Sequence, residues 1–338
     1  MRQYQRAIFF TKVPLGGFYK FEDIFQIFPV DLENMPKSSF QTHHPNILEY
    51  WITDEEKILI PEEFEGLEEL LETIGVALIK QDKILGLLST FTNNLFFRYT
   101  GLEGNWGMEM LKGKEANSRV SMWCMKMFYF PELSEQFKID KFTEQKIEPI
   151  KKIPRKVFYA YNPNLDFDSK KDVVFPETID QLLHSYFSLD AAKMLSVDAA
   201  VSYTVSAIEL WNSRKTLSLL ASFTSMETMV NLEFKDVAAE KCAICGQLKY
   251  SVARKFKEYL LKYIGTSENN KKKFNKYYSW RSKIVHTGQQ LKTEILFADV
   301  PKDEQHIEFV KRVEILQIGK LAITNWLLTN PSGVEQNI

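Results

Sequence analysis

The sequence predicts an α+β N-terminal domain (residues 1–165) followed by an all-α C-terminal domain (residues 175–330) that forms an antiparallel four-helix bundle. Two observations support this division. Prolines and glycines divide the beginning of the chain into short apolar runs, whereas apolar residues after Pro176 recur with helical spacing over long stretches. The polar, turn-rich segment 162–171 marks the boundary between them.

Length and composition bound the class of protein. The 338 residues suffice for two domains, and a hydrophobic content of 45% can supply each with a core. No apolar run approaches the ~18–20 residues that span a bilayer, and the beginning of the chain lacks the long apolar region of a secretion signal. Three cysteines do not make a disulfide framework. We therefore expect a cytoplasmic protein without membrane contact.

The N-terminal part combines short strands with one amphipathic helix. Strands are expected at apolar runs bounded by turn residues, namely 6–13, 57–60, 119–130 and 157–161. Pro61 and the acids after it open a helix to about Lys80, which 84–92 continues after a break. No motif here indicates a chemistry, so we expect a regulatory or sensor domain of unknown type that contacts a ligand or a protein.

In the C-terminal part, apolar residues at steps of three and four predict helices almost throughout. Short helices are expected at 179–187 and 191–195, and long helices at 199–232, 247–264, 271–286 and 304–328. Four long helices joined by short to moderate links favour an antiparallel bundle.

The predicted helix 271–286 carries an arginine on its apolar stripe. The stripe consists of Phe274, Tyr277, Tyr278, Arg281, Ile284, Val285 and Gly288. A guanidinium needs a partner in such a seam, because stripping its water is costly. Glu227 is the corresponding odd charge on the apolar stripe of helix 199–232. We predict that Glu227 and Arg281 meet across the bundle, where the pair either sets the helix register or assists catalysis.

A histidine follows near the end of the same helix. His286 precedes Thr287-Gly288, which indicates a helix end, where the helix dipole favours a protonated imidazole. Five residues turn a helix by about 500°, so Arg281 and His286 point about 140° apart, with about 7.5 Å of rise between them. A substrate that both contact would lie near the helix end or between two copies of the helix.

Charge is distributed unevenly along the chain. Residues 241–290 contain twelve lysines and arginines and two acids, a net charge of +10, so the rest of the chain carries −11 of the total of −1. This asymmetry, with aromatic residues interleaved, favours a nucleic-acid partner. The alternative is a solvated, lysine-rich helix face.

The pattern Arg281-x-x-x-x-His286, in the setting Tyr-x-x-Arg-Ser-Lys-Ile-Val-His-Thr-Gly, resembles the signature of HEPN domains and looks most like the Apea-like branch of that superfamily. The resemblance covers roughly residues 175–330. It implies a four-helix bundle that forms a homodimer, bringing two such helices together across a cleft. It also implies a metal-independent RNA endonuclease without a cofactor, of the kind that acts as a toxin or in antiviral defence.

The residue types suit this chemistry. Attack of a ribose 2′-OH on the adjacent phosphate needs a proton acceptor and then a donor, and His286 can be either. Arg281 offers two aligned donors to the phosphate oxygens. The expected products are a 2′,3′-cyclic phosphate and a 5′-hydroxyl. The resemblance adds Ser282 as an assisting polar residue, and Glu227 completes the candidate catalytic set.

Further residues of the basic segment are candidates for RNA contacts. Lys283 suits a backbone phosphate, and Trp280, which lies off the apolar stripe, suits base stacking or a dimer interface. The remaining candidates form the basic start of the helix: Lys271, Lys272, Lys273 and Lys276. A solvated helix start explains any one of these lysines as well.

A CxxC motif precedes this helix at Cys242 and Cys245. A tetrahedral zinc site needs four ligands, and a second CxxC is absent. Zinc would require a half-site completed by another copy, or a ligand such as histidine from elsewhere. We expect no metal here.

Two other functions stay open beside the nuclease. The C-terminal domain could be a non-catalytic module that binds RNA or a partner protein. Alternatively, the N-terminal domain carries the function and the bundle only dimerises. RNA cleavage that survives EDTA and requires His286 discriminates the nuclease from both.

Overall fold

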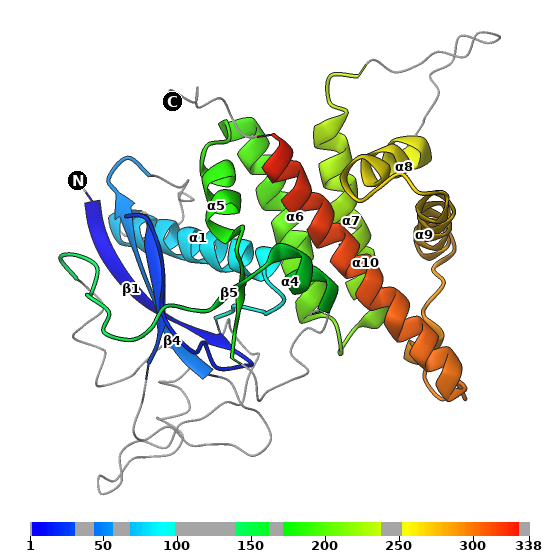
Figure 1. The fold of residues 1–338 in the computed structure, drawn as a ribbon, viewed down its shortest axis with the longest axis horizontal. Helices are drawn as coiled ribbons and strands as arrows, with labels where there is room; N and C mark the ends of the chain where they lie inside the picture. Colours follow the sequence, from blue (N-terminus) through cyan, green and yellow to red (C-terminus); the bar gives the residue numbers. More distant parts are fainter. Residues whose placement is uncertain are drawn as a thin grey trace, which may run out of the picture. The chain divides into compact units, whose positions relative to one another are not determined.

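The computed structural model of the chain describes residues 2–30, 44–56, 68–98, 139–161, 172–237 and 252–330. The chain divides into two compact units, one of residues 1–153 with 166–177 and one of residues 154–165 with 178–338. The first holds an antiparallel sheet and a long helix, and the second is helical (Figure 1). The expected order, α+β followed by α, is confirmed, although the chain returns to the first unit at 166–177.

A four-stranded antiparallel sheet in the order β1-β4-β3-β2 organises the first unit. Its strands are β1 (Arg2–Thr11), β2 (Tyr19–Phe21), β3 (Phe25–Pro29) and β4 (His44–Thr53). Only β1 was expected. The segments of β3 and β4 were interpreted as broken because of their prolines, but Pro29 ends β3 and Pro45 lies at the start of β4. At strand ends the missing N–H of proline disturbs little of the ladder.

Glu49 is a fully buried carboxylate in the middle of β4. Arg6 of β1 and Gln26 of β3 each donate to it at 2.6 Å. Thr143 donates its backbone N–H to Oε2 at 2.8 Å and its hydroxyl to Oε1 at 2.7 Å. These donors offset the cost of burying the charge, and they fix the segment around Thr143 to the sheet.

Helix α1 (Glu68–Phe91) packs against β4. The break expected after Lys80 is wrong, because the helix runs through this region, where Gln81 is buried and donates to the hydroxyl of Tyr50 at 2.8 Å. Two short strands, β5 (Lys152–Ile153) and β6 (Phe175–Pro176), pair in parallel. The strands expected at 57–60 and 119–130 lie outside the described residues.

The second unit is helical wherever it is described as regular structure. Its helices are α4 (Arg155–Tyr161), α5 (Ile179–Phe187), α6 (Ala191–Glu209), α7 (Lys215–Glu233), α8 (Val252–Tyr263), α9 (Glu268–Thr287), the 3₁₀ helix η2 (Lys292–Glu294) and α10 (Lys302–Thr329). The strand expected at 157–161 is wrong, since these residues belong to α4. So short an apolar run fits either structure.

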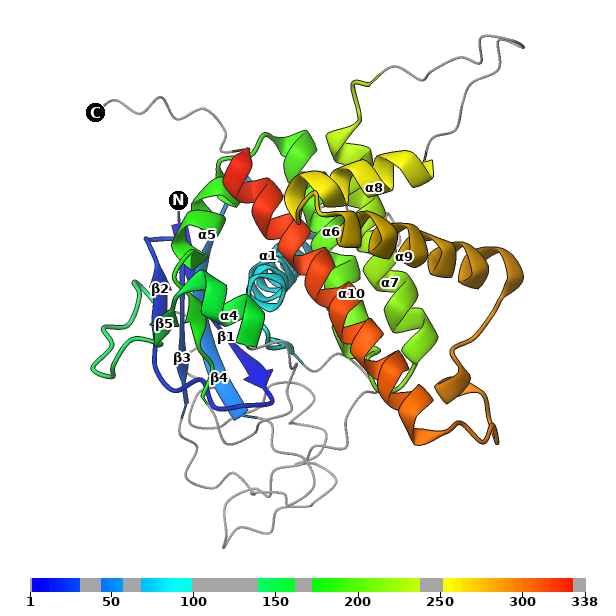
Figure 2. The ribbon, with the colours of Figure 1, turned by 45° about the vertical axis from the view of Figure 1, so that its right-hand side comes forward.

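Helix α10 is the central element of the second unit. It packs against α5, α6, α7 and α8, while α9 packs against α8 and α7 (Figure 2). Rings from three helices form the core between them: Phe223 and Phe256 have centroids 6.4 Å apart, and Phe256 and Tyr278 have centroids 5.6 Å apart. The part of α9 up to Tyr278 is thereby anchored in the unit.

The long helix expected at 199–232 is wrong, because the chain turns between α6 and α7. No proline or glycine marks the turn. Its buried Trp211 is held by Arg312 of α10, which lies 4.0 Å from the centroid of the indole ring and donates to the Trp211 carbonyl. A tertiary contact from far along the chain thus stabilises the turn.

Candidate functional site

Helix α9 has a defined beginning and end. The side chain of Ser267 accepts a hydrogen bond from the backbone N–H of Asn270 at 3.2 Å, which caps the N-terminus. Gly288 adopts the left-handed conformation, with φ +66°, and donates its N–H to the carbonyl of Ile284 at 3.1 Å. The predicted helix stop is confirmed. It places His286, which is exposed, in the last helical turn.

Glu227 and Arg281 meet between α7 and α9, as predicted. A terminal nitrogen of Arg281 donates to Oε2 of Glu227 at 2.8 Å. Nε of Arg281 lies 2.7 Å from Oε1, an ion-pair distance, but this second contact is not aligned as a hydrogen bond. The side chains are 20% and 18% exposed. Arg281 is therefore held by a carboxylate yet still reaches solvent.

The apolar stripe of α9 is buried only over its first half. Phe274 and Tyr277 are buried, whereas Val285 is 43% exposed and Gly288 is exposed. The expectation of a buried face is thus wrong for the last turns. The C-terminal end of α9 leaves the packed core, and it carries His286 with it.

Two polar side chains in the first half of α9 attach the helix to α10. Glu314 of α10 accepts hydrogen bonds from Lys273 and from the hydroxyl of Tyr277. Burial, with a further contribution from this carboxylate, raises the pKa of Tyr277 well above its usual range. Lys273 is therefore engaged within the chain. Lys271, the neighbouring RNA-contact candidate, pairs with Glu268 in its own first turn at 2.5 Å.

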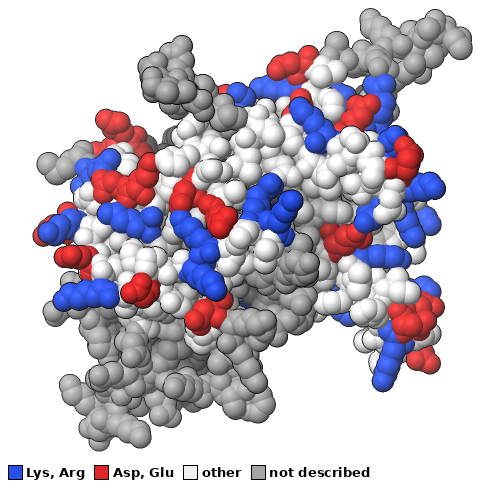
Figure 3. Space-filling view, viewed as in Figure 1, with Lys and Arg blue, Asp and Glu red and all other residues white. Residues whose placement is uncertain are grey.

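Three exposed lysines of α9 have no ion pair among the described residues: Lys272, Lys276 and Lys283. At 100° per residue they fall, with His286, within about 80° of one another, over about 21 Å of helix. Arg281 lies about 180° from Lys272 by the same count. We call Lys272, Lys276 and Lys283 the lysine row. Figure 3 shows basic side chains gathered where Figure 1 places α8 and α9, with carboxylates among them.

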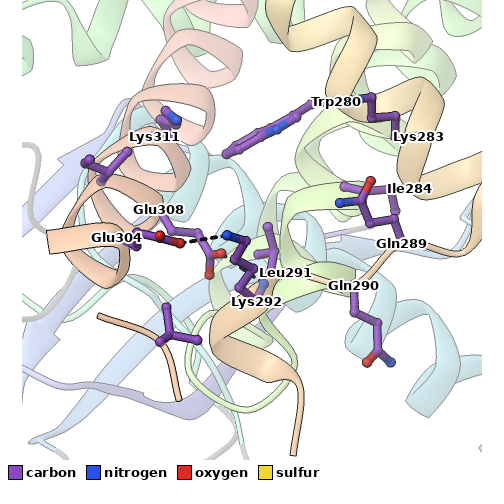
Figure 4. Close-up of a pocket in the computed structure, with 12 residues that line it drawn as sticks. Trp280, Lys283, Ile284, Gln289, Gln290, Leu291, Lys292, Glu304, Glu308 and Lys311 are labelled. Atoms are coloured by element: carbon purple, nitrogen blue, oxygen red, sulfur yellow. Dashed lines mark hydrogen bonds and ion pairs between the residues drawn. The ribbon is translucent and has the colours of Figure 1, made fainter. Parts of the chain in front are cut away.

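The remaining candidates of α9 face different surroundings. Ser282 is half-buried, and no hydrogen bond of its hydroxyl is found within the described part of the chain. Trp280 is half-buried and lines a pocket of about 270 Å³ between α9, the segment 289–292 and α10 (Figure 4). Lys311 of α10 holds its ammonium 5.1 Å from the centroid of the Trp280 ring.

The pocket residues on α10 were missed by sequence reasoning. Glu304, Ile307, Glu308 and Lys311 recur at helical spacing, so they were predicted to share a helix. Nothing local indicated that this face would lie against the last turns of α9.

Cys242 and Cys245 lie outside the described residues. Within the described ranges, no group of three or more His, Cys, Asp or Glu side chains is placed to hold a metal ion. In the same ranges, no helix is long and apolar enough to cross a bilayer.

Comparison of the chain with models of protein families, with curated proteins and with solved structures finds no match.

Proposed function

We propose that this protein is an endoribonuclease of the HEPN type, in which α7, α8, α9 and α10 correspond to the four-helix bundle. The observation that carries the proposal is the arrangement of α9. Its exposed His286 stands at the end of a row of lysines that form no ion pair within the described part of the chain. Arg281, on the other side of the helix, is fixed by Glu227 and still reaches solvent.

The chemistry proceeds without a metal. The imidazole of His286 accepts the proton of a ribose 2′-OH, whose oxygen attacks the adjacent phosphorus. The bond from phosphorus to the 5′-oxygen breaks, and that oxygen leaves with a proton from a protonated imidazole. Arg281 donates to the phosphate oxygens as charge builds on them. The lysine row holds the flanking backbone phosphates.

A homodimer would complete the site. Arg281 and His286 of one copy point about 140° apart, so the two meet one phosphate most readily when α9 helices of two copies face each other. Exposed apolar residues occur on and near this part of the unit: Val285, Leu296, Phe297, Ile307 and Val310. We expect twice the chain mass in sedimentation, and a monomer at all concentrations would contradict the dimer.

Cleavage of labelled RNA in the presence of EDTA tests the nuclease. We expect fragments with 2′,3′-cyclic phosphate and 5′-hydroxyl ends, identified by mass spectrometry. His286→Ala should lower the rate roughly 10²- to 10⁴-fold. His306→Ala, which removes an exposed histidine of α10, is the matched control and should cleave as the unaltered protein does. Equal rates for the two variants would remove His286 from the site.

A non-catalytic RNA-binding module is the second candidate, and the pairing of Arg281 with Glu227 favours it. A guanidinium that is already paired with a carboxylate stabilises the fold, and it is less available to a phosphate. This alternative predicts salt-sensitive RNA binding through the lysine row, with the bound RNA intact after long incubation. Toxin-like or antiviral activity would accompany the first candidate only.

A further inference from the structure

The pocket beside α9 combines an aromatic wall with several charged groups. Trp280 and Ile284 of α9 form one side, Leu291 another, and Glu308 and Lys311 of α10 the third (Figure 4). Its volume of about 270 Å³ lies just below the range of ordinary ligand pockets. The pocket therefore suits a ligand of the size of a single base or nucleoside, with a flat apolar surface.

The carboxylates of the pocket are already occupied. Glu304 pairs with Lys292 at 2.7 Å, and Figure 4 shows this contact at the side of the pocket opposite Trp280. Glu308 accepts from the backbone N–H of Lys292 at 3.1 Å and from the hydroxyl of Thr293. These acids therefore hold the segment after α9 in place.

Two cations that line the pocket, Lys283 and Lys311, are not held by these acids. Lys283 and Lys311 have no carboxylate partner among the residues that the structure describes. The ammonium of Lys311 lies 5.1 Å from the centroid of the indole ring, a cation–π contact. An aromatic ring with one ammonium group against it, and a second lysine in the same pocket, suits a flat ring that carries an anion.

The pocket wall is held in place from outside. The backbone N–H of Leu291 donates to the hydroxyl of Thr216 at 3.0 Å, and the ammonium of Lys215 donates to the carbonyl of Thr293 at 3.1 Å. Both partners belong to the first turn of α7. A wall fixed before the ligand arrives costs less to order on binding.

We propose that this pocket binds one nucleotide unit, with its base against Trp280 and its phosphate at Lys283 and Lys311. The proposal rests on the proposed function, because Lys283 also belongs to the lysine row, so an RNA strand that follows α9 would place one base at the pocket. The amides of Gln289 and Gln290 at the rim can both donate and accept hydrogen bonds, as discrimination between bases requires.

Calorimetric titration of the full chain with AMP, GMP, CMP and UMP tests the proposal. We expect saturable binding of at least one nucleotide, with ribose 5-phosphate and inorganic phosphate binding at least tenfold more weakly. Trp280→Leu should weaken nucleotide binding roughly tenfold or more, whereas Trp280→Phe should retain most of it. Lys311→Met should weaken binding of the nucleotide more than that of the matching nucleoside.

Trp51→Leu is the matched control, because Trp51 is a half-buried tryptophan of β4 that also lies under cations, at 4.3 Å from Arg2 and 4.0 Å from Lys80. It should bind nucleotides normally. Thermal unfolding of each variant shows whether it folds. Absence of nucleotide binding, equal binding of inorganic phosphate, or unchanged binding in a folded Trp280→Leu would each overturn the proposal.

The failure of the pocket can be told from the failure of the nuclease. His286→Ala should bind mononucleotides as the unaltered chain does, because His286 does not line the pocket. Cleavage that depends on His286 without mononucleotide binding would refute the pocket alone. Mononucleotide binding that requires Trp280, in a chain that never cleaves RNA, would refute the nuclease alone.

Discussion

At the scale of single residues, the strength of the Glu227–Arg281 pair bears on whether Arg281 stabilises the fold or is available to a ligand. The sequence allowed this contact to be predicted because each charge was out of place on its own helix and opposite in sign to the other. That one donor and one acceptor of the pair make no hydrogen bond could not be predicted. Nε of Arg281 and Oε1 of Glu227 have no hydrogen-bond partner within the described part, although they lie close together.

A double-mutant cycle measures the strength of this pair. Glu227→Gln and Arg281→Gln should each lower the free energy of unfolding by about 2 kcal/mol, because each leaves a largely buried group without its partner. The coupling energy should be roughly 1–3 kcal/mol. Urea unfolding of the single and double variants gives both quantities.

The control for this cycle is the exposed pair Lys271–Glu268 of the same helix. Both side chains are exposed and lie one turn apart on the helix, so their coupling energy should stay below about 1 kcal/mol. A coupling of Glu227 with Arg281 no larger than this would show that the pair stabilises the fold no more than a surface pair does. Arg281 would then be left to a role in binding or catalysis.

At the scale of elements, the basic side chains of α9 fall into two groups. Lys273 and Arg281 pair with carboxylates of neighbouring helices, and the lysine row lies on the exposed face. The basic character of this segment could be predicted from composition, but its division could not, because the partners of Lys273 and Arg281 come from α10 and α7. The outward side keeps the lysine row. The lysines that are available for the proposed RNA contacts are therefore fewer than the charge count of the segment suggests.

The lysine row should dominate the salt dependence of RNA binding. Replacing Lys272, Lys276 and Lys283 by Gln removes three phosphate contacts, so the slope of log K against log salt should become shallower by about 2 for a single strand. Fluorescence anisotropy with labelled RNA measures this slope. Lys271→Gln, at a lysine paired with Glu268, should change it little, and an equal change per residue would argue against a dedicated row.

The turn between α6 and α7 shows what local sequence leaves out. Apolar spacing continues across 199–232 without a breaker, so a single helix was the natural expectation. The chain turns there because Trp211 is buried and its carbonyl accepts from Arg312 of α10, about a hundred residues further on. The strand expected at 157–161 is a second misassignment, because so short an apolar run fits either a strand or the helix α4.

Arg312→Ala should loosen this turn. The variant loses the hydrogen bond to Trp211 and the contact over its ring, so the free energy of unfolding should fall by about 2–3 kcal/mol. Arg254→Ala, at an exposed arginine of α8, is the control and should change it by less than about 0.5 kcal/mol. Similar urea midpoints for the two variants would mean that the turn holds without Arg312.

At the scale of the whole molecule, buried tyrosines set a limit at alkaline pH in both units. Burial raises the pKa of Tyr50 in the sheet unit to about 12, and it raises the pKa of Tyr259 in the helical unit well above its usual range. Both folded-state values exceed the unfolded value of about 10. The folded chain therefore binds more protons than the unfolded chain above pH 10, and its stability declines there.

The unfolding free energy should fall as the pH rises from 10 towards 12. Tyr50→Phe should make this fall less steep for the sheet unit, because one shifted group is removed. Tyr203→Phe, at an exposed tyrosine of α6, should leave it unchanged. Equal slopes for Tyr50→Phe and the unaltered chain would contradict the assignment.

The general architecture could be predicted because strand-like runs give way to helical periodicity after Pro176. The pocket could not be predicted, because its walls come from the last turns of α9, the segment after it and the start of α10, which meet only once the chain has turned back. A surface built from three segments leaves no pattern in any one of them.

The left-handed backbone at Gly288 has one more consequence. A Cβ atom there would meet no neighbour, yet any other L-residue would resist a φ of +66°. Replacing this glycine would favour unwinding of the final turn, and the imidazole two positions earlier would lose its fixed direction. The direction of the His286 side chain therefore depends on Gly288, a residue that has no side chain of its own.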